Sequence, residues 1–213
     1  MNTCSRWVGV AHAARKGCLN VRLGLCLSLS LGLGLGLAAG SATAQAANIG
    51  GVEIEQTLDA AGTTLVLQGA GLRKRLFIKL YAAGLYVPEG SPAQATWLVD
   101  SDEPIAITLD IVSDLVTRDK MLEALNEGFA ASTGGDTSAV AAGIAQLQSA
   151  MGGAMAAGSS MTFTYEPAVG THVYRDNEQV ATIEGLAFKR ALFGIWLSDK
   201  PVATSLKAAL LGS

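Results

Sequence analysis

The pattern of apolar and polar residues predicts four β-strands in the first half of the chain. Strand-like runs cover residues 49–58, 63–71, 75–87 and 103–112, and the last of them has the period of two residues that is typical of a half-buried strand. Residues 59–62 separate the first two runs and read DAAG, which predicts a hairpin turn. We expect these strands to pair antiparallel.

The second half of the chain begins with a helical pattern. Met121, Leu125 and Phe129 recur at helical spacing behind Thr117, which is placed to cap the helix. Three short strands are expected after it, and two helices at the C-terminus; a further short helix is expected before the fourth strand. These elements are predicted at 160–167, 170–176 and 178–184 (strands) and at 91–99, 186–199 and 203–212 (helices). Strands grouped apart from helices predict an α+β fold, with helices covering one face of a mainly antiparallel sheet.

The first 44 residues have the pattern of a secretory signal peptide. Four basic residues precede an apolar run at 23–39, and Ala42, Thr43 and Ala44 form an A-x-A cleavage site. A membrane anchor is the alternative, but the glycines of the run favour cleavage. We therefore expect one domain at 45–213, exported to the periplasm and without a stable membrane anchor after cleavage.

Composition excludes several kinds of chemistry for the domain at 45–213. All three cysteines, Cys4, Cys18 and Cys26, precede it, so disulfides and thiolate sites are not expected. It contains 11 basic and 18 acidic residues, a formal charge of −7, which disfavours non-specific binding of nucleic acid. His172 is its only histidine, and the acidic residues lack metal-ligand spacing. We expect no metal or other cofactor.

A cluster of positive charge in this acidic chain needs an explanation. Residues 69–86 read GAGLRKRLFIKLYAAGLY. If they form one strand, Arg73, Arg75, Lys79 and Tyr81 share a face with Phe77, and leucines with Ile78 take the other. Such a face is either solvated or partly covered by a ligand. An anionic, largely apolar ligand would suit it, since arginine can bind a carboxylate through two parallel hydrogen bonds.

Three segments together resemble the bacterial chalcone isomerase-like proteins. They are LVLQGAGLRKRLFIKLYAAGLYVP, TRDKMLEALNEGF and PAVGTHVYRDNEQVATIEGLAFKRALFGIWLSDKPVATSLKAALLG. The resemblance spans about residues 49–212. It implies an open-faced β-sandwich, in which a large antiparallel sheet carries a layer of helices and a ligand cleft lies between them.

The resemblance also implies candidate site residues. Plant enzymes of this family cyclise chalcones with the help of an arginine, while fatty-acid-binding relatives pair that arginine with a tyrosine. The arginine falls on Arg73 and the tyrosine on Tyr81. Three other polar positions of the enzymes fall on Thr117, Ala124 and Ile195, so two of them are apolar here. Arg73 with Tyr81 is the fatty-acid-binding combination.

One geometric requirement follows for this pair. Eight residues of straight strand span roughly 26 Å, too far for Arg73 and Tyr81 to reach one carboxylate. The chain must bend, bulge or turn between Arg73 and Leu76, helped by Gly69 and Gly71. Otherwise Arg75 or Lys79 is the better partner for Tyr81.

Three functions are compatible with these patterns. The first is a non-enzymatic binding protein for a fatty acid or similar amphipathic carboxylate, with Arg73, Tyr81, Arg75, Lys79 and Thr117 as candidate ligand contacts. The second is a chalcone isomerase-type intramolecular lyase acting on a chalcone or another polyphenol-like ligand, with Arg73 as its catalytic residue. The third is an envelope protein whose cationic strand face binds an acidic partner.

Overall fold

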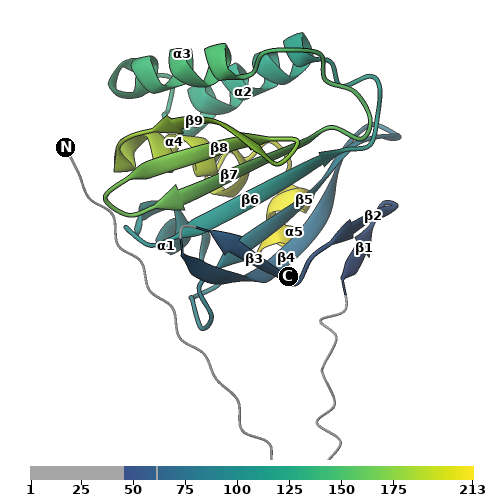
Figure 1. The fold of residues 1–213 in the computed structure, drawn as a ribbon, viewed down its shortest axis with the longest axis horizontal. Coiled ribbons are helices and arrows are strands. Elements are labelled where there is room, and N and C mark those ends of the chain that lie inside the picture. The colour runs from purple at the N-terminus through teal and green to yellow at the C-terminus, as the bar shows by residue number, and fades with distance from the viewer. Residues whose placement is uncertain (1–45, 61) are drawn as a thin grey trace, which may run out of the picture. The chain divides into compact units, whose positions relative to one another are not determined.

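A seven-stranded antiparallel sheet is the central element of the structure (Figure 1). The computed structural model describes residues 46–60 and 62–213, so the predicted signal peptide lies outside the described residues. The strands pair in chain order: β3 (Thr57–Ala60), β4 (Thr63–Arg75), β5 (Ile78–Val87), β6 (Ile105–Ile111), β7 (Ser160–Glu166), β8 (Gly170–Arg175) and β9 (Glu178–Ile183). A separate hairpin of β1 (Ala47–Ile49) and β2 (Val52–Ile54) precedes them.

Helices cover one face of this sheet. They are α1 (Ala95–Asp100), α2 (Arg118–Ser132), α3 (Ala141–Ala150), α4 (Leu186–Leu197) and α5 (Thr204–Leu210), with a 3₁₀ turn, η1 (Ser138–Val140). Helix α4 is buried along most of its length and packs against both α2 and the sheet, while α5 lies on β4 and β5 (Figure 1). None of the described helices is both long and apolar enough to span a membrane. The α+β class with an antiparallel sheet under a helical layer is confirmed.

Alternation along the strands divides the core in two. Ala83 and Leu85 of β5 belong to the main core beneath the helices, whereas Ala82 and Tyr86 belong to a smaller cluster with Ile54 on the opposite face. The described residues, 46–60 and 62–213, belong to one compact unit that contains both cores. A chain starting at Gln45 therefore holds every described helix and strand, and we expect it to fold on its own.

Glycines in β4 allow α5 to approach the sheet. A Cβ at Gly71 would lie 2.6 Å from Cβ of Ala209 in α5, and one at Gly69 would meet the carbonyl oxygens of that helix. A Gly-Ala-Gly run in a strand is typical of a tight bend or a close backbone approach, and the close approach is confirmed. The pairing of β4 with β5 also shifts between Leu67 and Gly69.

A buried lysine joins α4 to the end of α1. Nζ of Lys189 donates hydrogen bonds to the carbonyl oxygens of Leu98, Val99 and Ser101, at 2.6, 2.9 and 2.8 Å. Carbonyls at the end of a helix lack partners within it. Lys189 satisfies these three, which is how an ammonium group is accommodated at a fully buried position.

Three sequence predictions of secondary structure are wrong. The run 49–58 is not one strand, because the chain turns at Gly50 and Gly51 between β1 and β2, and β3 begins only at Thr57. The run 75–87 is not one strand, because the chain reverses at Leu76 and Phe77 between β4 and β5. The helix predicted at 91–99 begins only at Ala95, since its first hydrogen bond runs from the Leu98 amide to the Gln94 carbonyl. The reversal at Leu76 and Phe77 contains no glycine, proline, asparagine or aspartate, so the residue types that usually mark a turn are missing there.

Candidate functional site

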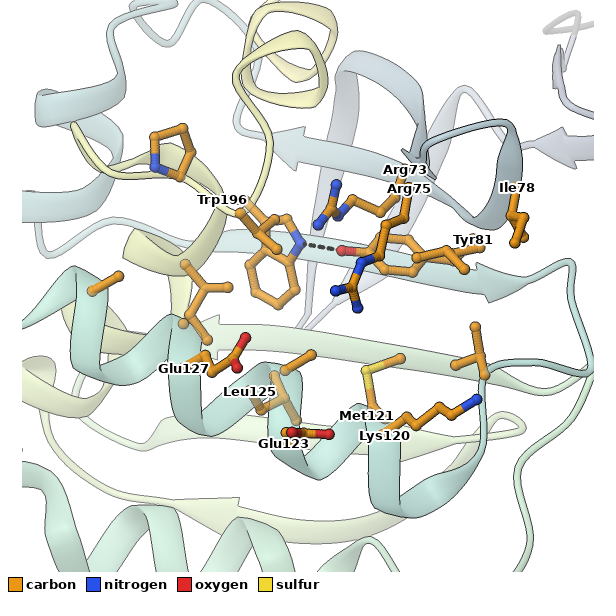
Figure 2. A pocket seen from close by; sticks show the side chains of 18 of the residues that line it. Arg73, Arg75, Ile78, Tyr81, Lys120, Met121, Glu123, Leu125, Glu127 and Trp196 are labelled. Atoms are coloured by element: carbon orange, nitrogen blue, oxygen red, sulfur yellow. Dashed lines mark hydrogen bonds between the residues drawn. The ribbon is translucent and has the colours of Figure 1, made fainter.

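A cavity of about 880 Å³ opens between the β4–β5 hairpin, helix α2 and the end of α4. Pockets for small molecules commonly measure about 300–1,000 Å³. Most of the residues lining this one are apolar, among them Leu80, Met121, Leu125 and Val202. Figure 2 shows basic and aromatic side chains entering it from the hairpin and from α4, opposite the side chains of α2.

Arg73 and Tyr81 lie directly opposite each other on β4 and β5. Opposed residues of antiparallel strands have Cβ atoms about 4.5–5.5 Å apart and point to the same side of the sheet. The two-residue turn at Leu76 and Phe77 therefore removes the distance problem that a straight strand would have created. Both side chains line the cavity.

An irregularity in the hairpin decides which of its other residues reach the cavity. The pairing shifts after Arg73, so that Lys74 opposes Lys79 and Leu80 has no partner. Arg75 and Ile78 oppose each other and line the cavity, whereas Lys79 does not. Two predictions are therefore wrong. Lys79 does not share a face of the sheet with Tyr81, and Ile78 is on the same face as Arg75 and not on the other one. The turn and the unpaired Leu80 break the alternation on which both predictions depended.

Tyr81 is held by a tryptophan on α4. Nε1 of Trp196 donates a hydrogen bond to the Tyr81 hydroxyl over 3.1 Å, drawn as the dashed line in Figure 2. Burial raises the pKa of Tyr81, while this hydrogen bond and the positive charge of Arg73 act to lower it. The phenol thus stays protonated at neutral pH. Because its oxygen already accepts from the indole, its own proton is available for an acceptor in the cavity.

Positive charge collects on the hairpin side of the cavity. The Arg73 guanidinium donates to the Lys74 carbonyl over 2.8 Å, and in residues 46–60 and 62–213 neither Arg73 nor Arg75 forms an ion pair with a carboxylate. Glu123 and Glu127 line the opposite wall, on α2 (Figure 2). Lys120 of α2 and Lys200 also line the cavity, and Nζ of Lys120 donates a hydrogen bond to the Leu115 carbonyl over 3.1 Å. Arg73 is the cation that lies directly beside Tyr81.

Small residues on α2 leave room in the cavity. Ala124, Gly128 and Ala131 follow one another at spacings of four and three residues, which places them on one face of the helix, and all three line the cavity. A Cβ at Gly128 would lie 2.7 Å from Cγ2 of Ile195, so this glycine also lets α2 pack closely on α4. Ala124 and Ile195, two of the positions matched to polar residues of the enzymes, thus make this part of the wall apolar.

Thr117 lies outside the cavity lining. Its hydroxyl accepts a hydrogen bond from the Lys120 amide over 3.4 Å and caps α2, which confirms the predicted start of the helix. Trp196 was not among the predicted site residues. It is 115 residues from Tyr81 in the sequence, and no local pattern indicates that the two meet.

Other candidate chemistry lies elsewhere or is not found. His172 is on β8, where its ring nitrogens lie 3.0 Å from a Glu166 carboxylate oxygen and 3.1 Å from the Thr182 hydroxyl. It therefore has structural partners away from the cavity. Within the described ranges there is no group of three or more His, Cys, Asp or Glu residues placed to hold a metal ion.

Comparison with solved structures agrees with this architecture. A crystal structure of a fatty-acid binding protein from Arabidopsis thaliana superposes with a TM-score of 0.60, at 18% sequence identity, covering 76% of this chain and 92% of that one. At such low identity the likeness concerns the fold. No curated protein sequence matches the chain significantly.

The family can be stated from the sequence match. The family model described as chalcone isomerase-like matches residues 46–212, which is nearly all of the described structure. The chain therefore belongs to the chalcone isomerase-like family.

Proposed function

We propose that this protein is a non-enzymatic binding protein for a fatty acid or a similar amphipathic carboxylate. The observation that supports it most directly is the meeting of Arg73 and Tyr81 on one wall of a mostly apolar cavity. A guanidinium and a protonated phenol are both hydrogen-bond donors suited to a carboxylate. The small and apolar residues of α2 that line the cavity, Ala124, Leu125 and Gly128 among them, suit a hydrocarbon tail.

Arg73 and Tyr81 have different roles in the proposed site. Arg73 supplies a positive charge opposite the carboxylate. Tyr81, which Trp196 orients, donates a further hydrogen bond to the headgroup. Arg75 lies at the exposed rim of the same face and adds positive charge. The similar fold of a fatty-acid binding protein from Arabidopsis thaliana is in keeping with this assignment.

Export completes the proposal. The basic residues, apolar run and A-x-A site of residues 1–44 are the basis for a secreted, periplasmic protein. N-terminal sequencing or intact mass of the secreted protein tests it. Retention of the first 44 residues would contradict cleavage.

The binding proposal is tested first by native mass spectrometry of the protein starting at Gln45, purified without added ligand, followed by organic extraction and lipid identification. We expect a co-purifying fatty acid in the wild type. After delipidation, titration with a long-chain fatty acid should restore binding. Arg73→Ala should weaken it roughly 10- to 100-fold, because a charge-assisted hydrogen bond is lost.

Lys79→Ala is the matched control. It removes a cation from the same hairpin, but at a position that does not line the cavity, so affinity should be unchanged. Failure of the delipidated wild type to take up long-chain fatty acid would refute the proposal.

An isomerase is the second candidate, because an arginine free of carboxylate partners can stabilise a developing oxyanion. The apolar Ala124 and Ile195 disfavour it, since they line the cavity where the enzymes are polar. Cyclisation of naringenin chalcone that is accelerated by the wild type and lost in Arg73→Ala would establish this activity instead.

A further inference from the structure

The tip of the β4–β5 hairpin exposes three consecutive apolar side chains. Leu76, Phe77 and Ile78 are 87%, 99% and 42% exposed. Single apolar residues are common on protein surfaces, whereas contiguous ones indicate contact with another molecule. We call residues 74–79 the hairpin tip.

The backbone of the tip adds to this indication. Leu76 has φ +55°, in the left-handed region where bulky residues are uncommon. Two-residue hairpin turns favour glycine or asparagine at such positions. A leucine and a phenylalanine are thus present where turn geometry alone would select other residues.

Positive charge surrounds the apolar residues. Lys74 and Lys79 oppose each other on the face away from the cavity, and Arg73 and Arg75 are on the cavity face. No acidic residue occurs between Asp59 and Glu89, although residues 45–213 carry a formal charge of −7. Cations are therefore concentrated on both faces of the hairpin in an otherwise acidic protein.

We propose that the hairpin tip docks on an anionic lipid membrane. Leu76 and Phe77 enter the interfacial region, and the four basic residues contact anionic headgroups. An apolar element with basic residues beside it matches such an interface, since apolar burial and attraction to anionic lipids act together there. The contact is peripheral and reversible.

Docking at this point would bring the cavity to the lipid surface. Leu76 and Ile78 belong both to the exposed tip and to the cavity lining. Leu115, between β6 and α2, also lines the cavity and is 51% exposed. An amphipathic ligand could then pass between bilayer and cavity without crossing water. The docking proposal goes beyond ligand binding and does not require it.

The test is co-sedimentation of the ligand-free chain starting at Gln45 with phosphatidylglycerol-containing vesicles and with phosphatidylcholine vesicles. We expect binding to the anionic vesicles that weakens with added salt, because surface charges are screened. Each cation near an anionic membrane contributes about a fivefold gain in affinity. Lys74→Glu with Lys79→Glu should therefore weaken binding by at least about 25-fold.

A second variant tests the apolar residues. Leu76→Asp with Phe77→Asp should lower binding by roughly tenfold or more, as expected when a large apolar side chain is no longer buried. Val169→Asp is its control, since Val169 is 41% exposed in the turn between β7 and β8, and should have no effect. Fatty-acid affinity should persist in the lysine double variant, because neither lysine lines the cavity. That separates failure of docking from failure of the proposed function.

Several outcomes would overturn the proposal. The wild type could fail to bind anionic vesicles, or it could bind both kinds of vesicle equally. Val169→Asp could also lose as much vesicle binding as Leu76→Asp with Phe77→Asp. Lipid-independent self-association that disappears in Leu76→Asp with Phe77→Asp would assign the tip to a second copy of the chain and would also overturn it.

Discussion

At the scale of single residues, the site depends on one contact between distant parts of the chain. Trp196 donates to the Tyr81 hydroxyl, and Tyr81 faces Arg73 across the hairpin. The indole thereby determines which way the phenol can donate. Trp196 is a positioning residue in the proposed function, and Arg73 and Tyr81 are the groups that would touch the ligand.

Trp196→Phe tests this role. The variant keeps an aromatic ring but loses the donor, so we expect fatty-acid affinity to fall about 2- to 10-fold, the usual value of one hydrogen bond. Isothermal titration of the delipidated protein measures it, with circular dichroism to verify folding. In a Tyr81→Phe background the same change should have little further effect, because the contact is already lost. Fully additive losses would show that Trp196 acts on binding by another route.

At the scale of elements, helix α2 determines how much of the cavity is free. Ala124, Gly128 and Ala131 form a face of small residues along it, and Gly128 lets the helix pack closely against Ile195 of α4. A bulky residue on this face would occupy the space assigned to the hydrocarbon tail.

Ala124→Trp is the corresponding prediction. Ala124 is exposed and lines the cavity, so an indole there should lower long-chain fatty-acid affinity by roughly tenfold or more through steric overlap. Stability should change by no more than about 0.5 kcal/mol, as is usual for surface positions. Titration and thermal unfolding provide the two measurements.

Ala130→Trp is its control on the same helix. Ala130 is also exposed but does not line the cavity, and its replacement should leave affinity unchanged. If both variants bind as the wild type does, the tail does not lie along α2.

At the scale of the whole molecule, buried tyrosines make stability depend on alkaline pH. Burial raises the pKa of Tyr86 and of Tyr165 to about 12, and for Tyr165 the hydrogen bond to Asp102 acts in the same direction. The unfolded chain releases these protons near the ordinary pKa of 10.0. The stability contributed by these two tyrosines should therefore be fully present below pH 10 and be lost as the pH rises from 10 toward 12.

Urea unfolding at a series of pH values measures this decline. The free energy of unfolding should fall by up to about 1.4 kcal/mol per pH unit for each tyrosine. Tyr165→Phe loses the 2.5 Å hydrogen bond to Asp102 and should cost about 1 kcal/mol at neutral pH. Its decline above pH 10 should be shallower than in the wild type. An equal slope in both proteins would show that Tyr165 is not one of the groups responsible.

Local and periodic features of the fold were determined by the sequence itself. Side-chain period predicts the strand at 103–112, the three strands between residues 160 and 184, and the two C-terminal helices. Capping chemistry predicts the start of α2 at Thr117. These depend on neighbours within a few residues. The α+β class follows from their order, and the close approach at Gly69 and Gly71 from the lack of side chains there.

Only the tertiary structure decided how the cationic stretch is used. Leu76, Ile78 and Leu80 keep a spacing of two residues past the reversal between β4 and β5, and no glycine, proline, asparagine or aspartate occurs between Leu72 and Tyr81 to mark a turn. Cross-strand pairing brings Arg73 to Tyr81, and the unpaired Leu80 leaves Lys79 outside the cavity. The contact from Trp196 depends on the packing of α4 against the sheet. Each is an interaction between residues far apart in sequence, which periodicity does not record.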